Sequence, residues 1–383
     1  MKRLLIAIPS YRWGGDTTAL FNLLNRLDTN QFKVDLFPIL DEGPYRERFT
    51  NCSLLRSSAI LESMLRKYSF SFNPHSILAF GLKALNRLSR GRMLNTIYRN
   101  VGRKLVKATE YDAVIAWTEW NPTTFVSFIP HKYKVAWIHC DYTFDNHEPY
   151  ELEAYRRVNR IVHVSFFCKN QFLGLYPEFK DKSVVVHNIL DIRQIAEKSQ
   201  EQVEDYPIGE GFHILSFGRI APGKRFSHIP GIAAAVRDSG VSFHWTIMGP
   251  DQHPDELERI RKNIAEHHVQ DCVSYLGSRS NPFPYIKRAD LVVNTSASEA
   301  HPLAILESMI LETPTINADF KAAYEVVDDG RNGLIVPLER IADAVKRFIT
   351  DEQLRNRLQE SLKDFHYSDD TAMKEFEQLF SHV

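Results

Sequence analysis

Short apolar runs recur along the whole chain, and this repetition constrains the fold more than any other feature of the sequence. Each run is four to eight residues long, most are continuously apolar, and Gly, Pro, Asn or charged residues bound them. Such runs are typical of strands buried on both faces, as in parallel sheets. The first half of the chain contains RLLIAIP, KVDLFPI, YDAVIAW, KVAWIHC, RIVHVS and SVVVHN, and the second half contains FHILSFG, FHWTIMG, CVSYLG, ADLVVNT, TPTINA and GLIVP.

Longer amphipathic stretches lie between many of these runs, for example at Thr17–Leu27, Glu148–Asn159, Pro254–Glu266 and Pro302–Leu311. Alternating strands and helices predict an α/β protein with doubly wound parallel sheets, covered by helices on both faces. A chain of 383 residues is long enough for two such domains. Ligands of open parallel sheets bind beyond the carboxyl ends of the strands, so we expect the functional residues in loops that follow strands and face a cleft between the domains.

One polar segment, Asp191 to Gly211, interrupts the alternation, and we interpret it as the linker. The sequence thus predicts a first domain over residues 1–205 and a second over 206–365. A helix over 366–383 is expected to pack back on the first domain. Within the first domain, residues 46–110 are interpreted as a basic helical insertion.

The composition excludes several classes of protein. A net charge of −1 argues against a nucleic-acid partner. The four Cys, at positions 52, 140, 168 and 272, form no Cys-x-x-Cys pair, which favours a reducing cytoplasm over a disulfide framework or a zinc site. The apolar start, Leu4–Ile8, is too short for a signal peptide. No apolar run approaches the ~18 residues of a membrane-spanning helix.

The stretch from Leu291 to Pro337 carries the strongest functional pattern. The strand LVVNT ends in a small polar loop, SASEAH, and Pro302 suits the first turn of the helix that follows. Backbone N–H groups at this helix start would attract a diphosphate. Glu299 in the loop suits neutral hydroxyls, and Glu307 within the helix suits the two hydroxyls of a ribose. For an isolated pair, a helix-capping acid and a solvated helix residue remain the alternative.

A second loop, FGRIAPGKR, formally contains the G-x-x-x-x-G-K of a phosphate loop from Gly218 to Lys224. A phosphate loop requires Ser or Thr at the next position to hold Mg²⁺, and Arg225 stands there. We therefore exclude a P-loop NTPase. Arg219 and Lys224 are cations that suit a diphosphate, although two solvated basic residues in a turn are the plainer interpretation.

Three more loops after strands hold weaker candidates. In AWIHCDY, His139 and Asp141 suit a hydroxyl-orienting pair, although a His satisfied at a strand end is about equally common. In SYRWGGD, Gly14 and Gly15 permit close backbone approach before a helix, as any tight turn would. In GSRS, Arg279 could stack on a base, although an exposed loop Arg is the safer interpretation.

Taken together, these motifs resemble the retaining glycosyltransferases of family four, which have the GT-B architecture of two facing Rossmann-like domains. Their Glu-x7-Glu signature corresponds to Ser296, Glu299, Glu307 and Ser308, and a downstream Glu and D-G-x-N-G to Glu325 and 329–333. Two departures, Ala300-His301 for the frequent Gly-Phe and Ser308 for Ala, bear on sugar specificity rather than on nucleotide binding.

The resemblance implies a role for each candidate. The second domain would bind the donor, with Arg219 and Lys224 on the diphosphate, Glu307 on the ribose and Glu299 on the sugar. The first domain would bind the acceptor. The catalytic residues implied are His139, Glu299, Arg219 and Lys224, the acceptor-binding residues are His139 and Asp141, and the donor-binding residues are Gly14, Gly15, Arg219, Lys224, Arg279, Glu299, Ala300, His301, Pro302, Leu303 and Glu307.

The implied reaction moves a sugar, with retention, from a nucleotide-diphosphate sugar to a hydroxyl of a saccharide or lipid-linked saccharide in cell-envelope polysaccharide synthesis. The chain has no Asp-x-Asp triplet, so we expect no metal and no cofactor besides the donor substrate. Two alternatives stay open. One is a nucleotide-sugar epimerase of the same fold, and the other is a non-catalytic protein that only binds a nucleotide sugar.

The first domain contains a strongly basic segment. Residues 46–107 contain 13 Lys and Arg against two acidic residues, Glu47 and Glu62, interleaved with apolar positions. Helices of this composition can rest on anionic lipid headgroups. We therefore expect a cytoplasmic protein with a peripheral position on the inner face of the cell membrane. A packed helical insertion with a solvated charged face is at least as common.

Overall fold

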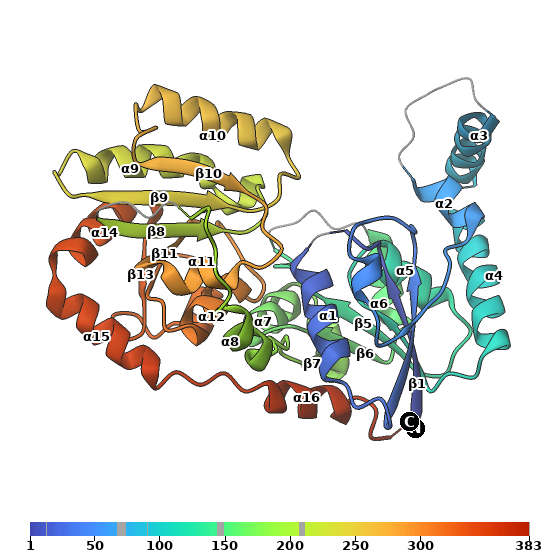
Figure 1. Cartoon of the computed structure of the whole chain (residues 1–383). Helices are drawn as coiled ribbons and strands as arrows, with labels where there is room; N and C mark the ends of the chain where they lie inside the picture. The colour runs from blue at the N-terminus through green and yellow to red at the C-terminus, as the bar shows by residue number, and fades with distance from the viewer. Residues whose placement is uncertain (13, 67–73, 90, 144–148, 207–210, 383) are drawn as a thin grey trace. The chain divides into compact units, whose positions relative to one another are not determined.

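The computed structural model describes residues 1–12, 14–66, 74–89, 91–143, 149–206 and 211–382. The chain divides into two compact units, one made of residues 1–189 and 370–383 and the other of residues 190–369 (Figure 1). The boundary lies before the polar segment that was interpreted as a linker, and that segment belongs to the second unit, where residues Ile192–Lys198 form helix α8. The prediction of a boundary at residue 205 therefore differs from the structure.

Asp369 explains physically why the boundary lies there. Its carboxylate accepts hydrogen bonds from the backbone N–H groups of Leu190, at 2.9 Å, and Ile192, at 3.0 Å. Leu190 and Ile195 also pack into the apolar core of the second unit. These contacts join the first and last residues of that unit. They hold the segment 191–211 in the second unit, although most of its side chains are polar.

The first unit is built on a seven-stranded sheet in which every neighbouring pair is parallel, with the order β3-β2-β1-β4-β5-β6-β7. The strands are β1 Lys2–Ile8, β2 Phe32–Pro38, β3 Ser53–Leu54, β4 Ala113–Ala116, β5 Lys134–Ile138, β6 Arg160–His163 and β7 Ser183–Val185. Six of them are the apolar runs identified in the sequence, and the strand prediction is confirmed there. β3 was not predicted, because two residues carry no period.

Helices of the first unit include α1 Gly15–Arg26, α2 Ala59–Leu65, α3 Pro74–Leu88, α4 Arg92–Ala108, α5 Asn121–Phe128, α6 Pro149–Arg156 and α7 Phe166–Leu175. Helices α2, α4 and α5 bury apolar side chains against Leu5 and Ala7 of β1. The segment interpreted as a helical insertion is mainly α2, α3 and α4, while residues 67–73 and 90 lie outside the described residues. Its first part is different, because β3 extends the sheet at the edge of β2.

The C-terminal helix α16, Asp369–Gln378, ends the chain within the first unit. Phe376 packs its ring 5.8 Å from Phe32 and 6.1 Å from Trp137. Phe380 lies 6.2 Å from Phe32, and the side chain of Glu375 receives the backbone N–H of His187. The helix expected over 366–383 thus lies against the first unit.

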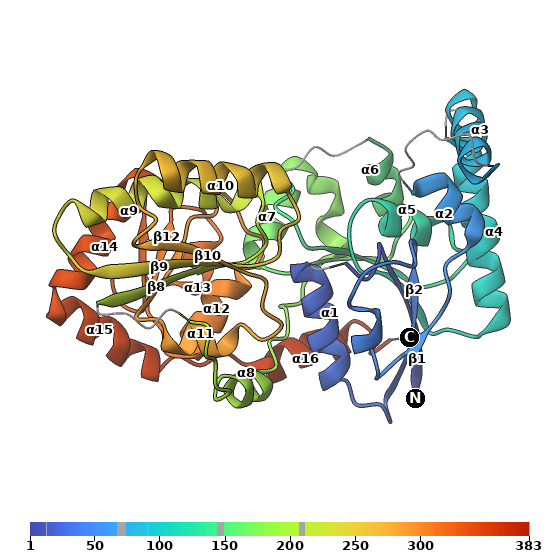
Figure 2. The same ribbon diagram turned by 45° about the horizontal axis from the view of Figure 1, so that its top comes forward.

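The second unit has a six-stranded parallel sheet with the order β10-β9-β8-β11-β12-β13. The strands are β8 Phe212–Phe217, β9 Phe243–Met248, β10 Val273–Gly277, β11 Leu291–Asn294, β12 Thr315–Ala318 and β13 Leu334–Val336, so the second set of apolar runs is confirmed as strands. The helices include α9 Ile229–Arg237, α10 Pro254–Glu266, α11 Phe283–Arg288, α12 Leu303–Ile310, α14 Ile341–Thr350 and α15 Glu352–Lys363 (Figure 2).

Both faces of the second sheet are covered, as continuous apolar strands require. Ile214 of β8 belongs to a core cluster shared with α9, α10 and α14. The next residue, Leu215, belongs to a separate cluster shared with α8, α11 and α12. Because successive side chains of a strand point to opposite faces, these clusters lie on the two sides of the sheet.

The strand order reverses direction beside β8. The chain runs from β8 outward to β9 and β10, and then returns to place β11 on the other side of β8. The loops after β8 and β11 consequently leave the same edge of the sheet as neighbours. This is the topological switch point, where open α/β sheets bind their ligands.

Candidate active site

Two loops meet at the switch point of the second unit. Lys224 ends a short 3-10 helix, Pro222–Lys224, in the loop after β8, and Glu299 lies in the loop after β11. The Lys224 Nζ atom lies 2.5 Å from the Glu299 Oε1 atom, and their side chains are 20% and 17% exposed. The Ser296 hydroxyl donates to the same carboxylate oxygen at 2.7 Å. The structure thus brings together two predicted residues that are far apart in the sequence.

Two hydrogen bonds to backbone carbonyls hold the two loops together. The Thr295 hydroxyl donates to the carbonyl oxygen of Lys224 at 2.6 Å, and the Ala297 N–H donates to that of Gly223 at 2.8 Å. A cavity of about 10 Å³ is lined by Lys224, Asn294, Ser296 and apolar side chains. Since this volume suits about one water molecule, a nucleotide would have to bind on the open side of the pair.

Glu307 lies on α12, with its side chain partly buried. Burial raises the pKa of its carboxyl group from 4.5 to about 8, and the nearby Lys224 ammonium opposes that shift. Among the described residues, no hydrogen bond or ion pair engages this carboxyl group. A desolvated carboxyl group without such a partner is able to take hydroxyl donors from a ligand.

Arg219 is the second residue after β8 and is exposed. Its neighbour Gly218 has a φ of +139° and donates its N–H to the Met248 carbonyl oxygen at 3.0 Å. Gly249 after β9 has a φ of +151°, and a Cβ atom there would overlap the Gly218 carbonyl oxygen. Two glycines are therefore needed where these loops cross, and the loop that carries Arg219 and Lys224 is fixed by this close approach.

The helix start after Glu299 differs in detail from the expectation. Helix α12 begins at Leu303, and Pro302 is the residue before it rather than part of its first turn. The Leu303 N–H already donates to the His301 carbonyl oxygen at 2.9 Å. Ala300 and His301 are buried, and the His301 ring centroid lies 6.4 Å from that of Tyr367. The bare amides expected here are thus partly occupied, while the donor-binding roles of residues 300–303 stay predictions.

Arg279 lies after β10 in an ion pair. Its Nε atom lies 2.8 Å from the Asp205 carboxylate and 3.2 Å from the Tyr285 hydroxyl. The Tyr285 hydroxyl in turn donates to Asp205 at 2.6 Å. This network fixes the guanidinium beside the polar segment, and stacking on a base stays a prediction.

The first unit places its candidates after β5. The His139 ring lies 5.0 Å from the Trp117 ring, and the Asp141 carboxylate accepts from the Thr143 N–H at 3.0 Å and hydroxyl at 2.7 Å. Asp141 therefore supports the local turn. The loop after the neighbouring strand β4 holds Glu119, which accepts hydrogen bonds from the backbone N–H groups of His139 and, at 2.9 Å, Cys140.

Sequence reasoning missed Glu119. It is 2% exposed, and burial raises the pKa of its carboxyl group from 4.5 to about 7 against the lowering effect of the amide hydrogen bonds. An acid two residues after the apolar run YDAVIAW was the signal that could have found it. The rule that singled out His139 applies equally to this loop.

Glu119→Gln should flatten the pH dependence of stability. The raised pKa means that the native state holds its proton more tightly than the unfolded chain, so stability falls as pH rises from about 4.5 to about 7. Gln cannot ionise, and the two proteins should differ in this loss by on the order of 2 kcal/mol. Urea unfolding at pH 5 and pH 7.5 measures it, with the exposed Glu110→Gln as control. Equal losses in wild type and Glu119→Gln would contradict the assignment.

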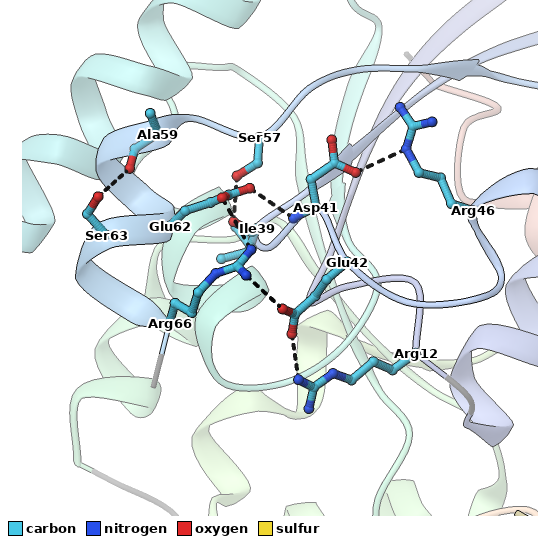
Figure 3. A network of polar contacts seen from close by, with 10 residues as sticks. All are labelled: Arg12, Ile39, Asp41, Glu42, Arg46, Ser57, Ala59, Glu62, Ser63 and Arg66. Atoms are coloured by element: carbon cyan, nitrogen blue, oxygen red, sulfur yellow. Dashed lines mark hydrogen bonds and ion pairs between the residues drawn. The ribbon is translucent and has the colours of Figure 1, made fainter. Parts of the chain in front are cut away.

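Gly14 and Gly15 stand at the start of α1, after β1. A Cβ atom on Gly14 would displace the end of the Asp16 side chain, and the backbone of Gly14 is extended, with a φ of −173°, a conformation that any residue can adopt. The cation next to this loop is already paired, because Arg12 lies 2.6 Å from Glu42, which also contacts Arg66 at 3.5 Å (Figure 3). The role of the two glycines toward a donor stays a prediction.

Comparisons with known proteins agree with this geometry. Residues 198–365 match the family of glycosyl transferases group 1, and this range includes both loops of the switch point and Glu307. The matched residues lie within the second unit.

Curated relatives align with part of the chain. It is 29% identical to the alpha-D-kanosaminyltransferase of Streptomyces kanamyceticus over 189 residues, which are 48% of this chain and 45% of that protein. It is 25% identical over 186 residues to the N-acetylgalactosamine-N,N'-diacetylbacillosaminyl-diphospho-undecaprenol 4-alpha-N-acetylgalactosaminyltransferase of Campylobacter jejuni, with 48% of each chain covered. The chain thus spans about half the length of these relatives.

Solved structures align over the whole chain. HepE of Anabaena, in complex with UDP and glucose, has a TM-score of 0.73 at 17% identity, with 100% of both chains covered. TarM of S. aureus, in a complex that contains UDP, has a TM-score of 0.74 at 14% identity with the same coverage. At these identities the likeness shows the fold. With the two parallel sheets described above, it confirms the predicted GT-B architecture.

Proposed function

We propose that this protein is a retaining glycosyltransferase that moves a sugar from a nucleotide-diphosphate sugar to a hydroxyl of a saccharide or lipid-linked saccharide. The observation that carries the proposal is the Lys224–Glu299 pair at the switch point, with the ligand-free carboxyl group of Glu307 on the adjoining helix. Arg219 and Lys224 would bind the diphosphate, Glu299 the sugar and Glu307 the ribose. HepE, which has this fold, is solved with UDP-glucose.

In the proposed reaction, the bond between the anomeric carbon and the leaving phosphate oxygen breaks. The acceptor hydroxyl oxygen bonds to that carbon from the same face, and its proton passes to the leaving phosphate. The diphosphate gains negative charge, which the cations Arg219 and Lys224 would stabilise. The proposed reaction needs neither a metal nor a nucleophilic side chain. Arg219 and Lys224 supply the positive charge, and the acceptor hydroxyl itself attacks the anomeric carbon.

The first unit would supply the acceptor side. His139 would orient the sugar or the acceptor hydroxyl, and Glu119 would hold the backbone of its loop. Within the described residues, no helix is long and apolar enough to cross a bilayer. We include in the proposal a cytoplasmic location, peripheral contact of residues 46–107 with anionic lipid, and a role in cell-envelope polysaccharide synthesis.

Thermal-shift measurements with a panel of UDP-, GDP- and ADP-sugars test the donor site. A donor at 100 times its dissociation constant stabilises the native state by about 2.7 kcal/mol, which gives a clear shift in melting temperature. The absence of a shift with every nucleotide sugar and nucleoside diphosphate would contradict the proposal. Incubation of the stabilising donor alone separates the rivals, because an epimerised sugar would favour an epimerase. Binding without turnover on any cell-envelope acceptor would favour a non-catalytic protein.

A further inference from the structure

A second cavity, of about 400 Å³, lies within the first unit and is lined by residues of α2 and α4. Its volume is in the range of small-molecule sites. Phe37 at the end of β2 and Ile97 of α4 are buried and form part of its wall, together with the partly buried Leu105. This cavity lies in the other unit from Lys224, Glu299 and Glu307 and shares no residue with that site.

The same cavity is lined by two cations, Arg56 and Lys104, and by the amide of Asn100. Both cationic side chains are exposed, and neither forms an ion pair or a hydrogen bond with a described residue. One wall is therefore apolar, while two exposed cations lie beside it without a described partner. That combination suits a ligand with an anionic head and an apolar body.

The neighbouring acids are committed to other partners. Glu62 accepts from the Asp41 N–H at 3.1 Å and lies 3.3 Å from Arg66, and Glu42 is shared by Arg12 and Arg66 (Figure 3). These two acids therefore do not neutralise Arg56 or Lys104. The backbone beside Arg56 is also fixed, because the Ser57 hydroxyl donates to the Ile39 carbonyl oxygen at 2.6 Å.

We propose that this cavity binds one phosphate-headed lipid, with its phosphate between Arg56 and Lys104 and the first part of its hydrocarbon chain against Phe37, Ile97 and Leu105. The phosphate would form charge-assisted hydrogen bonds to both cations, and the methylene groups against the apolar wall would be removed from water. The membrane contact of this protein would then depend on a single lipid site rather than on diffuse charge alone. The role in membrane contact rests on the proposed function, whereas the binding of the lipid in the cavity does not.

Titration of the full-length protein with farnesyl phosphate, a soluble phosphate-headed hydrocarbon, tests the site by calorimetry. Farnesol and inorganic phosphate serve as the two half-ligands, and both should bind at least tenfold more weakly. Arg56→Ala and Lys104→Ala should each weaken farnesyl phosphate binding about fivefold, and the double variant more than either. Arg103→Ala removes an exposed charge next to Lys104 that does not line the cavity, and it should leave binding unchanged.

A second measurement separates a lipid in a membrane from the free compound. Flotation with phosphatidylcholine vesicles, with and without phosphatidic acid, should show retention that Arg56→Ala and Lys104→Ala reduce more than Arg103→Ala does. Equal weakening by all three variants, or equal binding of farnesyl phosphate and either half-ligand, would overturn the proposal. The thermal shift with a nucleotide sugar should be the same in these variants, so this failure is distinct from a failure of the proposed function.

Discussion

Lys224→Ala should lower the rate of sugar transfer by about 10²–10³-fold. The ammonium group lies at the switch point, where the ion pair with Glu299 holds it before any ligand binds, and hydrogen bonds from the β11 loop hold the backbone carbonyls of Gly223 and Lys224. A fixed cation stabilises charge that develops on the leaving diphosphate, and Ala offers nothing in its place. The substitution also leaves Glu299, which is only 17% exposed, without its ion-pair partner.

The measurement is the initial rate of transfer, or of donor hydrolysis, with the nucleotide sugar that stabilises the wild type. Lys262→Ala is the matched control, because Lys262 is an exposed residue of α10 in the same unit and pairs only loosely with Glu266, at 3.5 Å. A rate within threefold of wild type for Lys224→Ala would remove this residue from the proposed mechanism.

Donor affinity should weaken as pH falls below about 8, by up to about tenfold per pH unit. The cause is Glu307, whose pKa burial raises to about 8 in the ligand-free protein. Ribose hydroxyls donate best to an ionised carboxylate, so binding selects the deprotonated form and releases a proton. At pH 6 about 1% of the Glu307 carboxyl groups are ionised. The donor affinity at pH 6 should therefore be about 100-fold lower than at a pH well above 8, where Glu307 is fully ionised.

Calorimetric titrations at pH 6, 7 and 8 in buffers of different ionisation enthalpy measure both the affinity and the proton release. The diphosphate of a nucleotide sugar stays ionised over this range and adds no titration of its own. Glu307→Gln should bind more weakly at pH 8 and show little dependence on pH, whereas the exposed Glu258→Gln should follow wild type. An affinity for wild type that is constant with pH would contradict the role assigned to Glu307.

The strands could be predicted from the sequence because burial on both faces leaves a local signature. Runs such as LVVNT and HILSFG are continuously apolar, and β11 and β8 have the corresponding residues buried between two helical layers. The unit boundary had no such signature. It depends on Asp369, an acid that contacts residues almost 180 positions earlier, and no local pattern identifies that pairing.

In the candidate site, too, some residues could be predicted from a local sequence pattern, whereas others depend on tertiary contacts. Glu299, Lys224 and Glu307 followed from a spaced motif and from the rule that strand ends bind ligands. By contrast, the partner of Arg279 could not be predicted, since Asp205 belongs to a polar segment without periodicity. Glu119 was within reach of the strand-end rule, but its carboxylate acts on the backbone of another loop, and such contacts depend on tertiary structure.

The division of the chain into units also bears on the order in which they are made. Residues 190–369 are contiguous, so the second unit is complete once its last residue has left the ribosome. The first unit begins earlier but lacks Phe376 and Phe380, whose rings contact Phe32, until residues 370–383 have been made. The second unit can therefore reach its native state first. Until residues 370–383 follow, Phe32 and Trp137 of the first unit lack these aromatic partners, and chaperone binding would matter most in that period.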